Sequence, residues 1–357
     1  MTQIQDILHL SEKLIQLDTR PENFQNLETA LEIIQEELSE FKIRKYSKNG
    51  YKSILVHNQK KIPEKFRLLF NCHLDIIPAK DEQFKPYIKN GRLYGAGAMD
   101  MKSNLACVLS VFKKVAQHTN YPLGIQFVTD EEIGGYNGTK YQVQSGVKSE
   151  FIIASEPTNL DVVYQAKGVL QCEISCFGTT AHSAYPWNGN NALENLLDFL
   201  KVFRKSFSNP SSELWETSYN IASITCENTS YNKIPDSCSV MIDIRYISSE
   251  ADTIKKKLEK IIPNNFKVDI YAFEPPLNTN KNHPDIGKIL DTSKEVTGKA
   301  HTLYSANGTS DARHFGKDGI EFGPVGGGIG TDEEWVEIAS LEKYSKILEK
   351  FILSINK

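Results

Sequence analysis

Apolar residues recur at helical spacing in two N-terminal segments and at strand spacing in the short runs that follow. Residues 4–18 and 24–41 carry an apolar side chain every three or four positions, which predicts two amphipathic helices. Four apolar, β-favouring runs predict strands at 53–57, 66–75, 123–130 and 150–155. A helical stretch at 102–118 interrupts them. This succession predicts an α/β fold in which helices pack on the faces of a sheet.

The pattern changes after about residue 165, where GVLQCEISCFG alternates like a strand with one solvent-exposed face. The next elements predict a compact α+β unit: a helix at 190–207, strands at 219–227 and 237–247, a helix at 250–261 and a strand at 266–272. The chain then returns to a helix at 284–298, a short core strand in IEFGPV and a closing helix at 340–356. We therefore expect one domain from residues 1–165 and 278–357, with 166–277 inserted into it.

Length and charge exclude several classes of protein. The chain has 357 residues, 40% of them hydrophobic, and a formal net charge of -4. It can bury a large core and has no general attraction to nucleic acid or anionic lipid. The N-terminal segment MTQIQDILHLSEKLIQL is interrupted by polar residues, and no run of about 18 apolar residues occurs. We expect a soluble, cytoplasmic protein with no nucleic-acid or membrane partner.

Histidine and carboxylate side chains gather where the predicted strands end. His73 and Asp75 are two residues apart in NCHLDIIP, so on a strand both point to the same face, where one binds a metal and the other orients it. A polar strand end is the alternative. Asp100 follows the glycine-rich segment GRLYGAGAM just before a predicted helix, where it suits either a carboxylate that bridges two cations or a helix cap.

An acidic pair follows another predicted strand. Glu131 and Glu132 in VTDEEIGG repel each other unless a cation or a proton separates their roles, so one suits a metal ligand and the other a base that activates water. A solvated acidic loop is the alternative. Glu156 follows the strand FIIAS, and His182 lies in GTTAHSAYP. Each of these is more often structural when alone, but their order and spacing would seldom arise by chance.

Taken together, these motifs resemble the M20 metallopeptidases, a family that includes acetylornithine deacetylase, succinyl-diaminopimelate desuccinylase, aminoacylase and glutamate carboxypeptidase. The resemblance covers most of the chain and is carried by CHLDIIP, GRLYGAGAMDMK, TDEEIGG, SEPT, GTTAHSAYP, NKIPD, DIR, GTSDARHF and GPVGGGIGTDEEWV. It implies a two-domain α/β protein. A zinc-peptidase-like, mixed-sheet catalytic domain would consist of residues 1–165 and 278–357, and residues 166–277 would form an inserted α+β lid and dimerisation domain.

The resemblance also implies roles for single residues. His73 and Glu156 would hold one zinc, Asp100 would bridge, and Glu132 would hold the second zinc. Glu131 would be the general base, Asp75 would orient His73, and His182 would reach an active site, usually the partner subunit's, to stabilise the oxyanion. The residues at positions where relatives bind a substrate carboxylate are Asn232, Arg245, Gly308, Thr309 and Ser310. The Arg245 guanidinium offers a planar, two-pronged match to a carboxylate, and a strand-surface salt bridge is its alternative.

One position departs from the family pattern. Relatives have a histidine that completes the shell of the second metal, and this chain has Gly330 there, which has no side chain to bind with. A catalytic zinc normally has three protein ligands. We therefore expect one tight Zn²⁺ site, with Co²⁺ or Mn²⁺ as substitutes, and a second site that is weak or empty. We do not expect His314, the nearest histidine in sequence, to replace the missing ligand.

The resemblance implies a metal-dependent amidohydrolase of amino-acid biosynthesis that acts as a homodimer on a small molecule. It would remove an acetyl or succinyl group from an N-acyl amino acid such as acetylornithine, acetyl-lysine or succinyl-diaminopimelate. Two alternatives remain open. One is a dipeptidase or carboxypeptidase of the same family. The other is an impaired or repurposed homologue that binds N-acyl amino acids without hydrolysis.

Overall fold

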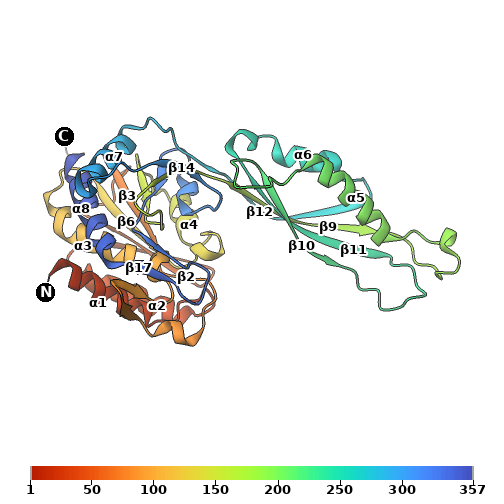
Figure 1. Cartoon of the computed structure of the whole chain (residues 1–357), viewed down its shortest axis with the longest axis horizontal. Coiled ribbons are helices and arrows are strands. Elements are labelled where there is room, and N and C mark those ends of the chain that lie inside the picture. Colours follow the sequence, from red (N-terminus) through yellow and green to blue (C-terminus); the bar gives the residue numbers. More distant parts are fainter. Residues whose placement is uncertain (1, 356–357) are drawn as a thin grey trace. The chain divides into compact units, whose positions relative to one another are not determined.

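The computed structural model describes residues 2–355, which divide into two compact units (Figure 1). The first unit contains the chain up to Gln165, then Asn278–Ser305, and then the chain from Ser310 onward. The second contains Ala166–Leu277 and the short segment Ala306–Thr309, which the sequence pattern did not indicate. No helix within residues 2–355 combines the length and apolar character needed to cross a lipid bilayer.

A mixed sheet forms the centre of the first unit. Its strand order is β1-β2-β6-β3-β7-β15-β8-β13, and β14 also pairs with β8. The bounds are β1 Lys42–Lys48, β2 Tyr51–His57, β3 Leu68–His73, β6 Leu123–Val128, β7 Ile152–Ala154, β8 Val162–Ala166, β13 Leu277–Asn278, β14 Leu303–Ala306 and β15 Gly319–Glu321. Strand β3 runs parallel to both β6 and β7, so all three end at the same edge of the sheet.

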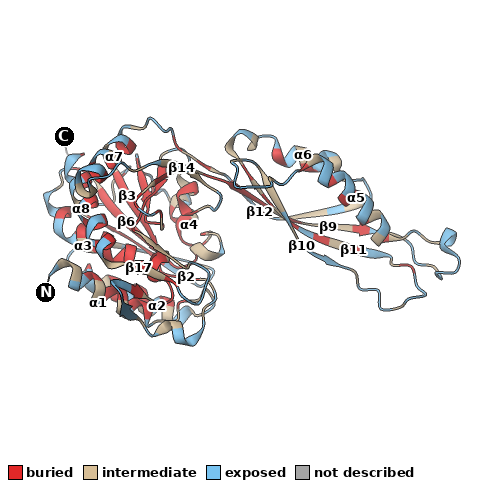
Figure 2. Ribbon diagram, in the orientation of Figure 1, coloured by how far each residue is buried: buried red, intermediate tan, exposed pale blue. Residues whose placement is uncertain are grey.

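Helices cover both faces of this sheet. They are α1 Gln3–Ile15, α2 Phe24–Glu37, α3 Ser103–Val115, α4 Thr139–Gln144, α7 Pro284–Thr297 and α8 Ile338–Ser354. The larger core joins α1, α2, α3 and α8 to side chains such as Phe70 and Phe127 on one face. A smaller core on the other face contains Leu55 and Leu69, with Tyr141 of α4 packed against it. Buried residues therefore run along the central strands (Figure 2).

A small second sheet in the first unit connects distant segments of the chain. Its order is β16-β17-β5-β4, with bounds β4 Tyr87–Lys89, β5 Arg92–Tyr94, β16 Gly326–Gly327 and β17 Trp335–Glu337. Trp335 lies opposite Tyr94 in the antiparallel β17–β5 pair. The C-terminal loop is thereby fixed beside the glycine-rich segment that precedes Asp100.

The second unit is a four-stranded antiparallel sheet with two helices on one face (Figure 1). The order is β10-β11-β9-β12, and the bounds are β9 Gly168–Phe177, β10 Ser218–Thr225, β11 Ser237–Tyr246, β12 Phe266–Glu274, α5 Ala192–Ser206 and α6 Ile254–Ile261. Side chains alternate along β9, so Leu170, Cys172 and Ile174 are buried under the helices. The predicted elements of this region are all present, with ends that differ by a few residues.

Candidate metal centre and active site

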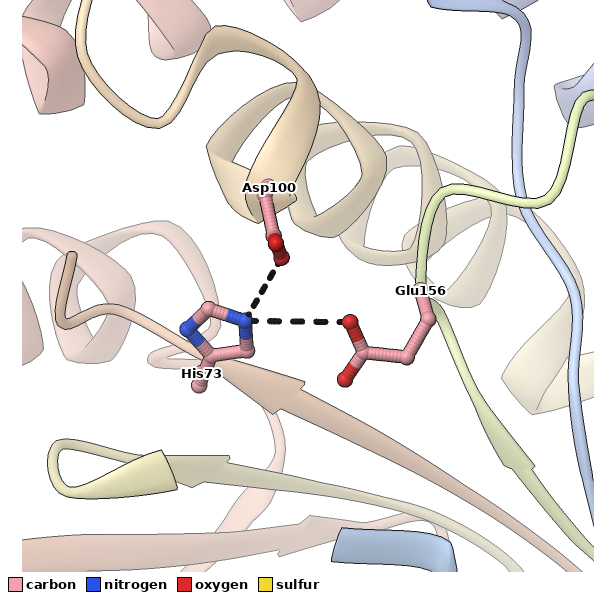
Figure 3. A group of neighbouring side chains, drawn as sticks. All are labelled: His73, Asp100 and Glu156. Atoms are coloured by element: carbon pink, nitrogen blue, oxygen red, sulfur yellow. Dashed lines mark hydrogen bonds and ion pairs between the residues drawn. The ribbon is translucent and has the colours of Figure 1, made fainter. Parts of the chain in front are cut away.

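His73, the last residue of β3, lies at the centre of a group of possible metal ligands (Figure 3). Its Nε2 atom is 3.1 Å from Asp100 Oδ1 and 3.9 Å from Glu156 Oε2. The ligand atoms of these three residues all lie within 4.8 Å of one another. His73 is 1% and Glu156 9% exposed, so water competes little with an ion for them. The spacing allows all three to bind the same ion.

The sheet explains why these residues meet. Glu156 follows β7, and β7 runs parallel to β3, so the carboxyl ends of both strands lie at one edge. Open α/β sheets commonly bind ligands at this edge. Asp100 comes from the irregular turn before α3, whose preceding residue Gly97 has a left-handed φ of 76°. The structure therefore brings together three of the predicted ligands.

Asp75 contacts His73 in a way that differs from the predicted strand geometry. Strand β3 ends at His73, so the expected strand at 66–75 is too long and Asp75 lies beyond it. The Nδ1 atom of His73 is 3.0 Å from the backbone oxygen of Asp75 and 3.6 Å from its Oδ1. The other carboxylate oxygen accepts the backbone N–H of Glu132 at 2.8 Å. Asp75 thus contacts the histidine and the acidic turn together.

Glu131 and Glu132 lie in the turn Glu131–Ile133, which follows β6. The next two residues, Gly134 and Gly135, have φ values of 105° and 64°. A Cβ atom on Gly135 would lie 1.9 Å from Asp311 Oδ1, so only glycine fits there. The turn consequently packs directly on residue 311.

The crowded carboxylates need a positive charge. Burial raises the pKa of Glu132 to about 8 and the pKa values of Glu131 and Glu156 well above their usual range. Burial lowers the pKa of His73, but hydrogen bonds to Asp100 and Asp75 outweigh this and raise it. The buried Glu156 Oε1 atom has no hydrogen-bond partner among the described residues. One imidazole and two carboxylates, one of which has an unpaired oxygen, therefore fit a divalent cation.

Sequence reasoning missed several buried charged residues near the site, and Glu321, Arg313 and Glu334 are three of them. Glu321 lies in β15, and burial raises its pKa to about 7; a lone acid within an apolar strand was the available signal. Arg313 is 4% exposed and donates to the backbone oxygens of Ser310 and Gly134 at 2.7 and 2.8 Å. The third is Glu334, which is 6% exposed and accepts backbone N–H groups around Asp100. No local pattern marks it.

Gly330 lies in an exposed turn and has a left-handed φ of 76°. A Cβ atom there would approach only Ile77 Cδ1, at 3.8 Å, so there is space for a side chain but the backbone favours glycine. His314 is outside the metal-ligand group. Its Nε2 atom lies 3.3 Å from the Gly134 oxygen and 3.5 Å from Asp311 Oδ1.

The remaining predicted site residues lie mostly in the second unit. These are His182, Asn232, Arg245, Gly308 and Thr309, whereas Ser310 belongs to the first unit. Arg245 Nε and Nη2 contact the two Asp243 carboxylate oxygens at 2.7 and 3.0 Å, so the strand-surface salt bridge is present. The Asn232 Oδ1 atom accepts the Ser230 hydroxyl at 2.6 Å. Their roles toward a substrate stay predictions.

A family model described as Peptidase family M20/M25/M40 matches residues 69–354. The chain belongs to this family. An M20 relative, succinyl-diaminopimelate desuccinylase from Pelagibacter ubique, is 29% identical over 313 residues, covering 80% of this chain and 81% of the relative.

Solved structures have the same fold. Aminopeptidase PepT from Bacillus cereus superposes with a TM-score of 0.80 at 15% identity and 99% coverage of both chains. An M20 family metallo-carboxypeptidase from Sulfolobus solfataricus gives 0.77 at 18% identity, covering 97% of this chain and 98% of its own. The predicted family, the mixed-sheet α/β fold and the enzyme class, a metallo-hydrolase of amide bonds, are confirmed. M20 enzymes use divalent metals, and the His73 group fits one.

Proposed function

We propose that this M20 enzyme removes an acyl group, acetyl or succinyl, from an N-acyl amino acid. The observation that carries the proposal is the convergence of His73, Asp100 and Glu156 at the edge where the Glu131–Glu132 turn also lies. The 29% identity to a succinyl-diaminopimelate desuccinylase favours a succinylated diamino acid, with acetylornithine and acetyl-lysine as related candidates.

His73, Asp100 and Glu156 would hold one tightly bound zinc ion. When bound, the ion would polarise the scissile carbonyl and lower the pKa of water toward about 7. The second position would have Glu132 and the shared Asp100 but no side chain from Gly330, so we propose that it binds metal weakly or not at all. Co²⁺ and Mn²⁺ are the proposed substitutes for zinc.

Glu131 is the proposed general base. Its carboxylate takes a proton from the attacking water and delivers it to the amide nitrogen as the C–N bond breaks. Burial raises the pKa of Glu131 well above its usual value, so a nearby cation would be needed to keep this carboxylate ionised and able to accept a proton. Asp75 positions His73 and the turn that carries Glu131.

His182 is the proposed donor to the developing oxyanion, acting in the partner subunit of a homodimer. Its side chain is exposed, and its Nδ1 atom accepts the backbone N–H of Ala184 at 3.1 Å. An accepting Nδ1 places the proton on Nε2, which is then free to donate. Removing such a donor commonly costs about 3–4 kcal/mol of transition-state stabilisation. The second unit would serve as the lid and dimerisation domain.

The substrate carboxylate is the proposed partner of Arg245, Asn232 and the Gly308–Ser310 segment. Arg245 already forms an ion pair with Asp243, so a substrate carboxylate would share the guanidinium with Asp243 or displace it. Dipeptides and C-terminally free peptides carry the same carboxylate. Peptidase activity is therefore the alternative, and the assay must include peptide substrates.

Metal analysis and one hydrolysis panel test the proposal. The purified full chain, loaded with Zn²⁺, is assayed with N-succinyl-diaminopimelate, N-acetylornithine, N-acetyl-lysine and dipeptides. We expect one tightly bound zinc per chain and turnover of an acyl-amino acid. Preferential dipeptide cleavage would select the peptidase alternative. If the chain neither binds zinc nor turns over any of these substrates, the remaining interpretation is a homologue that does not hydrolyse amides.

A further inference from the structure

Glu334 is a buried acid in the C-terminal loop to which the proposed mechanism gives no part. Its side chain lies at the start of the segment that enters β17, and it is 6% exposed, whereas the neighbouring Asp332 and Glu333 are exposed. Burial of an ionisable group is costly unless it has specific partners. The contacts of Glu334 therefore indicate what it does.

Those partners are backbone N–H groups of the turn that presents Asp100. The Glu334 Oε1 atom accepts from Met99 at 2.8 Å and from Asp100 at 2.9 Å, and Oε2 accepts from Gly97 at 3.0 Å. In addition, the backbone oxygen of Glu334 accepts the N–H of Gly95 at 3.2 Å. One residue thus forms four hydrogen bonds to residues 95–100.

Two backbone hydrogen bonds within residues 95–102, at 3.1 and 2.8 Å, also hold this turn, but its conformation is irregular. Gly97 has a left-handed φ of 76°, and Asp100 has φ −122° and ψ 89°, outside the helical range. Helix α3 begins only at Ser103. Without the Glu334 carboxylate, the N–H groups of Met99 and Asp100 would lose their acceptor in a buried part of the molecule. The direction of the Asp100 side chain depends on this backbone.

We propose that Glu334 is a positioning residue for the metal site, because it fixes the backbone from which Asp100 reaches toward His73 and Glu156. This inference rests on the proposed function in that Asp100 must bind the ion. It assigns the C-terminal loop a role in metal binding even though Gly330 supplies no ligand. Glu334 touches neither the ion nor the substrate; it acts through Asp100.

The test compares Glu334→Gln with Glu333→Gln in the full-length, metal-stripped protein. Zn²⁺ affinity is measured by competition with a chromophoric chelator. Glutamine keeps the size of the side chain but replaces one accepting oxygen with an NH₂ group, which would face the backbone N–H groups of the turn. We therefore expect Zn²⁺ affinity to fall about 10- to 100-fold, as for other groups that orient metal ligands. The exposed Glu333→Gln control should bind like the parent.

A merely structural role would produce a different result. It would lower the melting temperature of the stripped protein and leave Zn²⁺ affinity unchanged. Hydrogen–deuterium exchange adds a local measurement: the amides of Gly97, Met99 and Asp100 should exchange faster in Glu334→Gln, while those of β3 should not change. Glu334→Asp, which keeps the charge on a shorter side chain, serves if the glutamine variant does not fold, and should weaken binding less.

The outcomes separate this inference from the proposed function. Parental Zn²⁺ affinity in Glu334→Gln, or in Glu334→Asp where the glutamine variant does not fold, overturns the inference alone, provided that the parent binds zinc tightly. A parent that binds no zinc overturns both, since Asp100 then holds no ion. A selective loss in the Glu334 variants supports the inference whichever substrate the enzyme proves to hydrolyse.

Discussion

Asp75 accepts the backbone N–H of Glu132 at 2.8 Å, and its own backbone oxygen lies 3.0 Å from Nδ1 of His73. A single acid therefore connects a predicted metal ligand to the turn that carries the predicted base. The two segments leave neighbouring parallel strands, β3 and β6, so their relative position is set by the sheet and refined by this one residue.

Asp75→Asn should weaken metal binding without unfolding the protein. The amide oxygen can still accept the Glu132 N–H, but the negative charge beside the imidazole is lost. We expect Zn²⁺ affinity to fall about 10- to 100-fold. Competition with a chelator measures it, with the exposed Asp81→Asn as the control. Equal affinity in both variants would show that the backbone oxygen alone orients His73.

Glu131→Gln should abolish proton transfer and leave zinc in place. We expect kcat to fall by a factor of about 10² to 10⁴, which is the usual contribution of a general base. Zinc content after dialysis should match the parent, because Glu131 is outside the His73, Asp100 and Glu156 group. A variant that retains most of its turnover would require a different base.

The metal-free protein should become less stable as pH rises. Burial raises the pKa of Glu132 from 4.5 to about 8 and that of Glu321 from 4.5 to about 7. The folded state therefore holds protons that the unfolded state releases above pH 4.5. This stabilisation is complete below that pH and is lost as pH rises through 7 to 8. Thermal melts between about pH 5.5 and 8.5 measure it. Added Zn²⁺ should reduce the loss, and a melting temperature that rises with pH would contradict the prediction.

Gly330→His should show whether the missing ligand can be restored, with Gly330→Ala as the matched control. Both variants place a Cβ on a backbone with φ 76°, which costs about 1–2 kcal/mol. The alanine variant should therefore be less stable and bind metal like the parent. The histidine variant should bind a second equivalent of Zn²⁺ more tightly, which isothermal titration would detect. Identical titrations for the two variants would show that a histidine side chain at position 330 does not bind the metal.

Mixed dimers test whether His182 acts across a subunit interface. His182→Ala and Glu131→Gln should each be nearly inactive. In an equimolar mixture that exchanges subunits, half of the dimers are mixed and each has one intact site, so about a quarter of parental activity should return. Light scattering establishes the dimer. A fully active monomer would remove His182 from this role.

The sequence indicated His73, Asp100 and Glu156 because each has a local signal, namely a polar residue at a strand end or after glycines, and the structure brings these three together. Strand β1 was missed since KIRKYSK is polar, although the Asn49-Gly50 pair marks its hairpin with φ values of 49° and 87°. Glu334 could not be predicted, because its acceptor role depends on N–H groups more than 230 residues earlier in the chain. Long-range contacts of this kind leave no periodic pattern.

The close contact between Gly135 and Asp311 also limits how this enzyme can be re-engineered. With no room for a Cβ at 135, and with Arg313 donating to the Gly134 oxygen, the acidic turn and residues 310–314 fit each other as a matched pair. In a chimaera that takes only the acidic turn from a relative, the new turn would not fit against residues 310–314 of this chain. Laboratory evolution of new specificity should therefore exchange the two segments together.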